Sequence, residues 1–368
     1  MKSKKNSLFT AVGLCPACAL FILGGALSLA IPGKALASLP KNTVVRTIKV
    51  GSRPACLVCS PDGQFVYVGG NSEELYVIDA TTNRLSSSFT VSGLDGAIFA
   101  LAISSDGQTL YSPAIDFETL YVMSIATQSV TTYVTLNGFP TSEALTPDGT
   151  QLWIGISAGD SGVNGINIVD TANDQVNPTP IQLPGIPFSV VFTPDGTYAY
   201  VSYNANGVYS LALIDTASQT VVNSNVAGSS LHANTYGPEQ LTMDPNGKEL
   251  FVNEFTSVSG PDYTVTESVN TSNNKTKQVY STAGTDYNVT VSSQNITPNG
   301  KYLYFGIESS ESKKGTVVTV DTAQAQTVGQ PVTVGVSPVA IAIKPNGRDA
   351  YVANESSNTV TVINITPE

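Results

Sequence analysis

A four-residue turn signature recurs seven times along this 368-residue chain and strongly limits the folds open to it. Most copies read Ser or Thr, then Pro, then Asp or Asn, then Gly, and the seven copies begin at residues 60, 104, 146, 193, 244, 297 and 344. Pro presets φ at the second position of a type I turn, and Gly at the fourth accepts a positive φ without strain. Each copy therefore predicts a hairpin corner, and the seven together predict seven repeats of one supersecondary unit.

The spacing of these corners matches one blade of a β-propeller. The turn glycines lie 44, 42, 47, 51, 53 and 47 residues apart, which is the period of a four-stranded blade with variable loops. A short strand is expected after each corner, as at 65–68, and a third strand ending in Asp follows it, as at 75–79 and 317–321. That Asp is expected to cap the next turn by accepting backbone N–H hydrogen bonds. Charged residues make up only 12% of the chain, which suits strands and tight turns.

The two ends of the repeat region predict how the ring closes. The chain enters the repeats with a lone fourth-type strand at 44–50 and leaves them with a third-type strand at 359–365. The N-terminal strand is therefore expected to complete the last blade, a three-plus-one closure that removes an open sheet edge. The prediction is an all-β fold, a seven-bladed β-propeller of four-stranded antiparallel blades, which residues 38–368 form as a single domain.

Residues 1–37 differ in composition and are predicted to form a secretory signal peptide. Three lysines within the first five residues precede an uncharged stretch at 6–33, and small residues at 35–37 allow cleavage before Ser38. An uncleaved membrane anchor is the alternative, because 28 uncharged residues exceed the roughly 18 that suggest a spanning helix. Both interpretations place the propeller outside the cytoplasm, in the periplasm, on the cell surface or secreted.

The charge balance argues against several classes of partner. Removal of residues 1–37 takes away four lysines and no acidic residue, which changes the net charge from −11 to −15. Such a protein repels phosphate backbones and anionic lipids. We therefore expect no nucleic-acid partner, and membrane association only through an uncleaved N-terminal segment.

Cys56 and Cys59 follow the N-terminal segment with a spacing that is also found in redox and metal sites. On one strand their Cα atoms lie about 10 Å apart, beyond the roughly 7 Å limit for a disulfide. The sequence offers no further ligands for a zinc site at this pair, and Ser60 stands where a c-type haem motif has histidine. Both cysteines are therefore predicted to fill the core.

Part of the last repeat carries a resemblance to a known family. Tyr351 to Asn354 read Tyr-Val-Ala-Asn, and residues 67–70 and 200–203 approximate the same motif. The chain resembles the YVTN-repeat propellers over residues 41 to 368, a likeness that implies the fold. It implies little about activity, because the family includes cell-surface propellers and is similar to lactonase-like ones. The second repeat departs from the pattern, with Ser105 in place of Pro.

Alignment of the innermost strands on the turn signature places two polar residues at core positions. Four residues before the Pro position, the column contains Leu57, Leu101, Glu143, Val190, Leu241, Gln294 and Ile341. Period-2 alternation puts this column on a face that packs against a neighbouring blade. An unpaired carboxylate is costly there, so Glu143 is expected to have a hydrogen-bonding or cationic partner, or to reach the central channel. A structural network and a functional site are both open interpretations of Glu143.

The channel mouth, where fourth strands lead into first strands, is predicted to be the ligand face, because loops often carry function. The candidates there are Arg53, Asp95, Phe99, Phe139, Phe188, His232, Tyr236, Glu239, Asp286 and Tyr287, together with Glu143 and Gln294 from the inner strands. His232 is the only histidine, so it cannot build a histidine-rich metal site. No cofactor is predicted, and the acids of this set would hold calcium only if their side chains converge.

Two functions are compatible with these residues. The first is a non-enzymatic binding or interaction scaffold whose mouth face takes a protein, a glycan or a small ligand, and the scarcity of catalytic residue types favours it. The second is a lactonase-like hydrolase, in which Glu143 or another acid positions water or a metal and Arg53 binds an anionic substrate. The near absence of His and Trp disfavours a third class, the quinone- or haem-dependent oxidoreductases.

Overall fold

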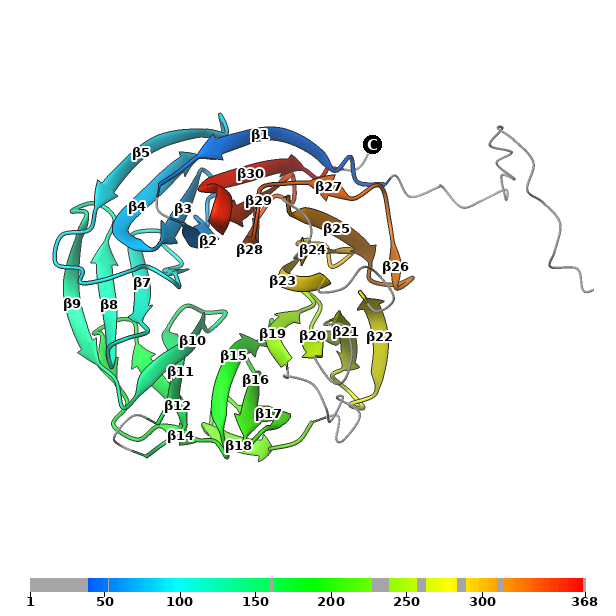
Figure 1. Cartoon of the computed structure of the whole chain (residues 1–368). Coiled ribbons are helices and arrows are strands. Elements are labelled where there is room, and N and C mark those ends of the chain that lie inside the picture. The colour runs from blue at the N-terminus through cyan, green and yellow to red at the C-terminus, as the bar shows by residue number, and fades with distance from the viewer. Residues whose placement is uncertain are drawn as a thin grey trace, which may run out of the picture. The chain divides into compact units, whose positions relative to one another are not determined.

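Seven β-blades stand around a common centre in the computed structural model (Figure 1), which describes residues 39–51, 53–158, 162–226, 238–256, 263–282, 289–309 and 314–366. The predicted all-β, seven-bladed propeller with four-stranded antiparallel blades is confirmed. Blades 5 and 6 are joined by one parallel pair, Tyr263 with Val289, and the other blades are separate sheets. Among the described residues, no helix is both long and apolar enough to cross a membrane.

The strands of each blade follow one another from the ring centre outward. Blade 1 contains β2 (Pro54–Cys59), β3 (Phe65–Gly70), β4 (Ser72–Asp79) and β5 (Arg84–Thr90). Blade 2 contains β6 (Ala102–Ile103), β7 (Thr109–Ala114), β8 (Thr119–Ser124) and β9 (Ser129–Thr135). Blade 3 contains β10 (Phe139–Leu145), β11 (Gln151–Ser157), β12 (Gly165–Asp170) and a divided outer strand, β13 (Gln175–Val176) and β14 (Ile181–Gln182). Blade 4 contains β15 (Ile186–Phe192), β16 (Tyr198–Ala205), β17 (Val208–Asp215) and β18 (Thr220–Asn223).

The remaining blades follow the same plan. Blade 5 contains β19 (Pro238–Met243), β20 (Glu249–Thr256), β21 (Tyr263–Asn270) and β22 (Thr276–Ser281). Blade 6 contains β23 (Val289–Ile296), β24 (Tyr302–Ser309), β25 (Thr316–Asp321) and the short β26 (Gln326–Thr327) and β27 (Val332–Thr333). Blade 7 contains β28 (Pro338–Ile343), β29 (Asp349–Asn354), the 3-10 helix η2 (Glu355–Ser357) and β30 (Thr359–Asn364), with β1 (Thr43–Lys49) outside.

The first strand of the ring lies beside the last one. β1 pairs antiparallel with β30 from Thr43 opposite Asn364 to Lys49 opposite Thr359, so the outer strand of blade 7 comes from the N-terminal side of the repeats. The signature turns also form a continuous circle. A Cβ placed on Gly107 would lie 3.4 Å from Pro61 Cδ, and one placed on Gly63 would lie 3.5 Å from Pro345 Cδ. The turn of blade 1 therefore contacts the turn of blade 7 as it contacts that of blade 2.

Hydrogen bonds within the turn explain why its residues recur. In blade 4 the Thr193 hydroxyl donates to Asp195 Oδ1 at 2.6 Å and accepts from the Tyr198 amide at 3.1 Å. The same hydroxyl-to-carboxylate bond closes the turns that begin at Ser60, Ser104 and Thr146. Gly196, at the fourth position, has a φ of +71°, as the type I turn prediction requires. Each position of the signature thus has a structural task in forming the corner.

The closing Asp of the third strand also behaves as predicted. Asp79 Oδ1 accepts hydrogen bonds from the amides of Thr81 at 2.7 Å and Thr82 at 3.1 Å. The Thr81 hydroxyl and these amides lower the pKa of the Asp79 carboxyl to about 2. The prediction that this residue type caps the turn into the outer strand is confirmed.

Apolar side chains fill the spaces between neighbouring blades. Trp153 of blade 3 and Phe192 of blade 4 are in edge-to-face contact, with ring centroids 5.2 Å apart. Cys56 and Cys59 lie on the single strand β2 as predicted, and both thiols are free. Cys56 packs with residues of blade 2, and Cys59 packs on the opposite face with residues of blade 7. Burial raises the pKa of Cys59 to about 12, so this thiol stays protonated at neutral pH.

Candidate functional site

The two rims of the ring differ in construction. Because the strands of a blade alternate in direction, the turns between second and third strands lie at the same end as the connections from fourth to first strands. We call this end the mouth face and the end with the seven signature turns the turn face. Among the candidates that lie in the described residues, Arg53, Asp95 and Phe99 precede the inner strands of their blades, whereas Phe139, Glu143, Phe188 and Gln294 lie in inner strands.

Arg53 is tied to blade 7. Its guanidinium donates to Glu355 Oε1 at 2.7 Å, and its amide donates to Asn358 Oδ1 at 2.7 Å. The residue holds a positive φ of 43°, and its carbonyl accepts from the Asn71 amide at 3.3 Å. Arg53 therefore joins the first and last blades at the mouth face, and its charge is balanced by Glu355.

Glu143 lies in the inner strand β10 with its carboxyl deep among protein atoms, although part of the residue remains exposed. Its carboxylate forms no hydrogen bond or ion pair within the described part of the chain. Burial alone raises the pKa of this carboxyl to about 8. Of the three expectations for Glu143, reaching the ring centre fits this partly exposed position.

Cys56 of blade 1 is buried near the loop of blade 2 and is affected by the charge of Glu143 in blade 3. The inner strand of blade 2 is reduced to β6 (Ala102–Ile103), and residues 92–101 before it form a loop. Within this loop the Ile98 amide donates to the Gly70 carbonyl at 2.9 Å, and the Cys56 thiol donates to the Ile98 carbonyl at 3.3 Å. Burial raises the pKa of Cys56, and the charge of Glu143 raises it further.

Gln294 is part of a network between two inner strands. Its side-chain amide donates to the Gln240 carbonyl at 3.0 Å, and the Gln240 amide group donates to the Ser292 carbonyl at 3.2 Å. These bonds tie β23 to β19 across the interface of blades 5 and 6. The polar exception in this column is thus explained by a structural network, with Gln294 Oε1 buried and accepting no bond in the described structure.

Four other candidates lie outside the described residues, namely His232, Tyr236, Asp286 and Tyr287. Glu239 lies within β19, but its side chain is outside the described part. Among the described residues, no group of three or more His, Cys, Asp or Glu side chains is placed to hold a metal ion. Calcium binding by these acids, expected only if their side chains converge, therefore stays a conditional expectation.

Six large apolar side chains are exposed toward the mouth end of blades 2 to 4. The members are Phe99, Ile115, Phe117, Phe139, Ile186 and Phe188, with exposed fractions of 36% to 48%. Val208, at the start of β17 in blade 4, also lies at the mouth end and is 63% exposed. Its neighbour Tyr209 contacts the Phe188 ring at a centroid distance of 5.9 Å. We call the six the mouth-face apolar set. The remaining exposed large apolar residues of the described structure lie on outer strands or toward the turn face.

Charge is distributed unevenly between the blades. The chain has no lysine or arginine between Arg84 and Lys248, whereas the same stretch contains thirteen Asp and Glu residues. This stretch covers blades 2, 3 and 4. Asp116 is exposed and Glu118 is half-buried in the β7–β8 turn that carries Ile115 and Phe117, and Asp95 is exposed in the loop that carries Phe99. The mouth-face apolar set is therefore accompanied by acids, and blades 2 to 4 themselves supply no basic residue.

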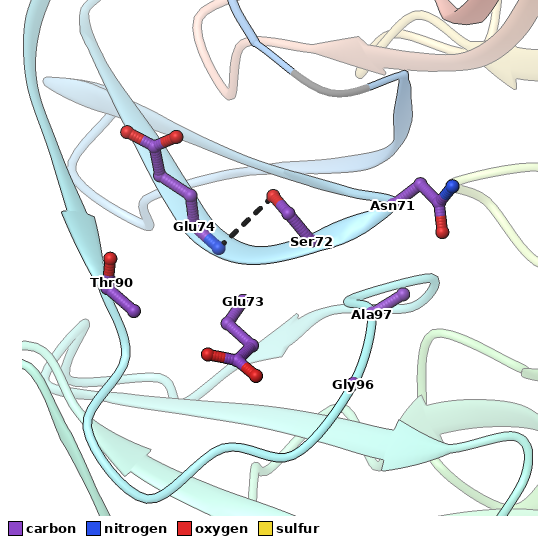
Figure 2. A pocket seen from close by; sticks show the side chains of 7 residues that line it. All are labelled: Asn71, Ser72, Glu73, Glu74, Thr90, Gly96 and Ala97. Atoms are coloured by element: carbon purple, nitrogen blue, oxygen red, sulfur yellow. Dashed lines mark hydrogen bonds between the residues drawn. The ribbon is translucent and has the colours of Figure 1, made fainter.

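A hollow of about 490 Å³ lies between the β3–β4 turn with the start of β4 and the loop that carries Phe99. Figure 2 shows its lining, in which the Glu73 side chain extends toward Gly96 while Glu74 lies on the other side of the strand. The Tyr76 hydroxyl donates a hydrogen bond to the Glu74 carboxylate, and this bond lowers the pKa of the Glu74 carboxyl. Glu73 is left facing the hollow.

Hollows on the turn face recur with the repeat. Four of them lie between the signature turns of adjacent blades, for instance the one lined by Pro147, Asp148, Asp195 and Gly196. Because the same turn chemistry builds each of them, they follow from the architecture. The Glu73 hollow has no such counterpart among the described hollows.

Comparison with solved structures agrees with the architecture. One similar structure is Kuenenia stuttgartiensis hydrazine synthase, with a TM-score of 0.75 and 20% identity over 86% of this chain and 96% of that one. Another is the β-propeller domain of Myceliophteria thermophila Cps50 (Swd1), with a TM-score of 0.67 and 13% identity over 88% of this chain and 100% of that one. These likenesses show the fold alone. No family model matches the chain, and no curated protein matches it.

Three members of the mouth-face apolar set were not expected from the sequence, namely Ile115, Phe117 and Ile186. A signal for them exists, because Ile115 and Phe117 stand in a turn between two strands, where polar residues are usual. The absence of basic residues from blades 2 to 4 is a second signal that the sequence contains.

Proposed function

We propose that this chain is an exported, non-enzymatic β-propeller that binds a partner at the cell envelope or surface through its mouth face. The observation that carries the proposal is the mouth-face apolar set, because exposed aromatic and aliphatic side chains gathered on one face mark interaction surfaces. The rigid ring supports it, since it presents loops from several blades at fixed positions.

Membership of the YVTN-repeat propellers is part of this proposal. In blade 7, Tyr351 and Val352 are fully buried on β29, and Asn354 donates to the Thr361 hydroxyl at 2.9 Å and to the Thr359 carbonyl at 3.2 Å. The motif residues thus pack the blade and fasten β29 to β30. This structural role supports a blade construction shared with the YVTN-repeat propellers, but it does not indicate a shared ligand.

Export is tested by locating the protein in cells and sequencing its N-terminus. The proposal expects a mature chain that begins at Ser38 in an extracytoplasmic fraction, or an intact membrane-anchored chain if the N-terminal segment is retained. A full-length chain in the cytoplasm would overturn the export part and leave the binding part to its own test.

Binding is tested by capturing partners with the wild-type protein and with matched variants. The double variant Phe139→Ser and Phe188→Ser removes two rings of the mouth-face apolar set, and Val222→Ser removes an exposed apolar group from the outer strand of blade 4. A partner retained by the wild type and by the Val222 variant, but lost by the double variant, supports the proposal. A partner retained equally by all three contradicts it.

A lactonase-like hydrolase is a second candidate because one observation favours it. A carboxyl with a pKa of about 8 can exchange protons near neutral pH, and Glu143 is such a group at the ring centre. Turnover of a lactone panel that is lost in Glu143→Gln would support a hydrolase. Hydrolysis no faster than in buffer would reject it for those substrates.

A further inference from the structure

The mouth face of blades 2 to 4 offers two kinds of chemistry together. Phe99, Phe139 and Phe188 are each more than a third exposed, so part of their apolar surface is available for contact. Asp95, Asp116 and Glu118 lie in the same loops or turns as members of the mouth-face apolar set. An aromatic ring attracts a cation over its face, and a nearby carboxylate adds Coulombic attraction.

The surrounding sequence sharpens the charge preference. No lysine or arginine occurs between Arg84 and Lys248, so no cation of blades 2 to 4 neutralises these acids. The mouth-face arginine nearby, Arg53, is already paired with Glu355 at 2.7 Å. The hollow lined in part by the Phe99 loop adds the carboxylate of Glu73 (Figure 2). An anionic ligand would meet only like charge here, which disfavours phosphates, nucleic acids and anionic lipid surfaces.

We propose that the mouth face of blades 2 to 4 binds a basic segment of a partner protein, in which lysine or arginine side chains stand next to apolar ones. This inference rests on the proposed binding function and specifies its partner. The apolar side chains of the segment pack on the mouth-face apolar set, and its cations lie against the Phe rings, Asp95, Asp116 and Glu118. The Glu73 hollow receives a further basic side chain.

Synthetic peptides test the charge and the apolar requirement separately. Three short probes of equal length are compared by fluorescence anisotropy with the whole propeller: alternating lysine and leucine, alternating glutamate and leucine, and alternating lysine and serine. The lysine–leucine probe is expected to bind at least tenfold more tightly than the other two. Raising the salt concentration from ~0.1 to ~1 M shortens the screening length from about 10 to 3 Å and should weaken its binding.

Two sets of variants place the site. Phe139→Ser with Phe188→Ser removes apolar anchors, and Asp116→Asn with Glu118→Gln removes charges from the β7–β8 turn. Each pair is expected to weaken lysine–leucine binding about tenfold, because few residues carry most of the energy of an interface. Val222→Ser on the outer strand is the matched control and should change affinity less than about twofold. Circular dichroism confirms that each variant is folded.

The outcomes separate this inference from the binding function on which it rests. If the glutamate–leucine probe binds as tightly as the lysine–leucine probe and both depend on Phe139 and Phe188, the mouth face binds partners but the basic-segment proposal is wrong. If no probe binds, the basic-segment proposal is also wrong, and the capture experiment decides the function independently. If neither set of variants changes the affinity for the lysine–leucine probe, the probe is attracted by the negative charge of the whole protein, and the proposal is wrong.

Discussion

Replacement of Glu143 with Gln is expected to stabilise the propeller at neutral pH and to leave its stability in acid unchanged. Burial raises the pKa of this carboxyl in the folded chain to about 8, whereas an exposed Glu in the unfolded chain titrates near 4.5. Above pH 4.5 the unfolded state therefore binds fewer protons than the folded state. The free energy of unfolding of the wild type consequently falls as the pH rises from 4.5 to about 8. Gln keeps the shape of the side chain and has no proton to lose.

The size of the effect follows from the interval between the two pKa values. One pKa unit corresponds to about 1.4 kcal/mol, so the interval from pH 4.5 to pH 7 corresponds to ~3 kcal/mol. Glu143 remains partly exposed, and solvent at its surface reduces the penalty for ionisation. We therefore expect Glu143→Gln to raise the free energy of unfolding at pH 7 by about 2 to 3 kcal/mol.

Urea unfolding of both proteins at pH values of about 4.5 and about 8, which bracket the titration, measures this difference. The Gln variant should exceed the wild type at the higher pH and equal it at the lower one. Asp116→Asn, on the exposed β7–β8 turn, is the control and should change stability by less than about 0.5 kcal/mol. A difference between Glu143→Gln and the wild type that is the same at both pH values would refute the reasoning, because Glu143 would then be ionised in the folded chain.

Three further predictions concern the turn face. Gly149→Ala places a side chain on a residue with a φ of +72°, with its Cβ 3.0 Å from Ser105 Oγ, and should lower the free energy of unfolding by about 1 to 2 kcal/mol. Gly162→Ala, at a φ of +73° with open space around it, should cost less. Lys344→Met removes the buried side-chain amine that donates to the carbonyl of Ala80 at 2.7 Å, and should lower the free energy of unfolding, measured by heat or urea, by about 1 to 3 kcal/mol. An unchanged free energy of unfolding would mean that this hydrogen bond between blades 7 and 1 does not stabilise the fold. Hydrogen bonds from the Thr146 hydroxyl and the Thr150 amide lower the pKa of Asp148 below 3.8, so their stabilisation is present above pH 3.8 and is lost as the pH falls through the folded-state pKa. Asp148→Asn should therefore make the free energy of unfolding less dependent on pH in this acidic range.

The fold could be predicted because its determinants are local. The signature residues of each turn act within six residues of one another, as the Thr193, Asp195 and Tyr198 bonds show, and Gly at the fourth position is common to all seven, so the sequence alone marks the corners. The shortened inner strand of blade 2 could not be predicted in the same way. In the loop at 92–101 the Ile98 amide bonds to the Gly70 carbonyl of blade 1, a tertiary partner that the local sequence does not reveal.

The candidate site was predictable only in part. Phe139 and Phe188 follow from their place near the start of inner strands, and Phe99 follows from the corresponding place in the second repeat, which the structure forms as a loop; all three are exposed. The surroundings of Glu143 and Gln294 were not predictable, because both occupy one sequence column and only the neighbouring blade distinguishes them. Gln294 meets the Gln240 carbonyl there, whereas burial alone sets the pKa of Glu143. The role of Arg53 likewise depends on Glu355, which lies 302 residues away in the sequence.

Hydrogen–deuterium exchange of the propeller, with and without the lysine–leucine peptide, tests the central claim that the mouth face of blades 2 to 4 is the binding surface. The account predicts slower exchange in the loop at 92–101, in the β7–β8 turn and at the starts of β10 and β15, with no change at the signature turns. Protection confined to the signature turns or to the outer strands would contradict it.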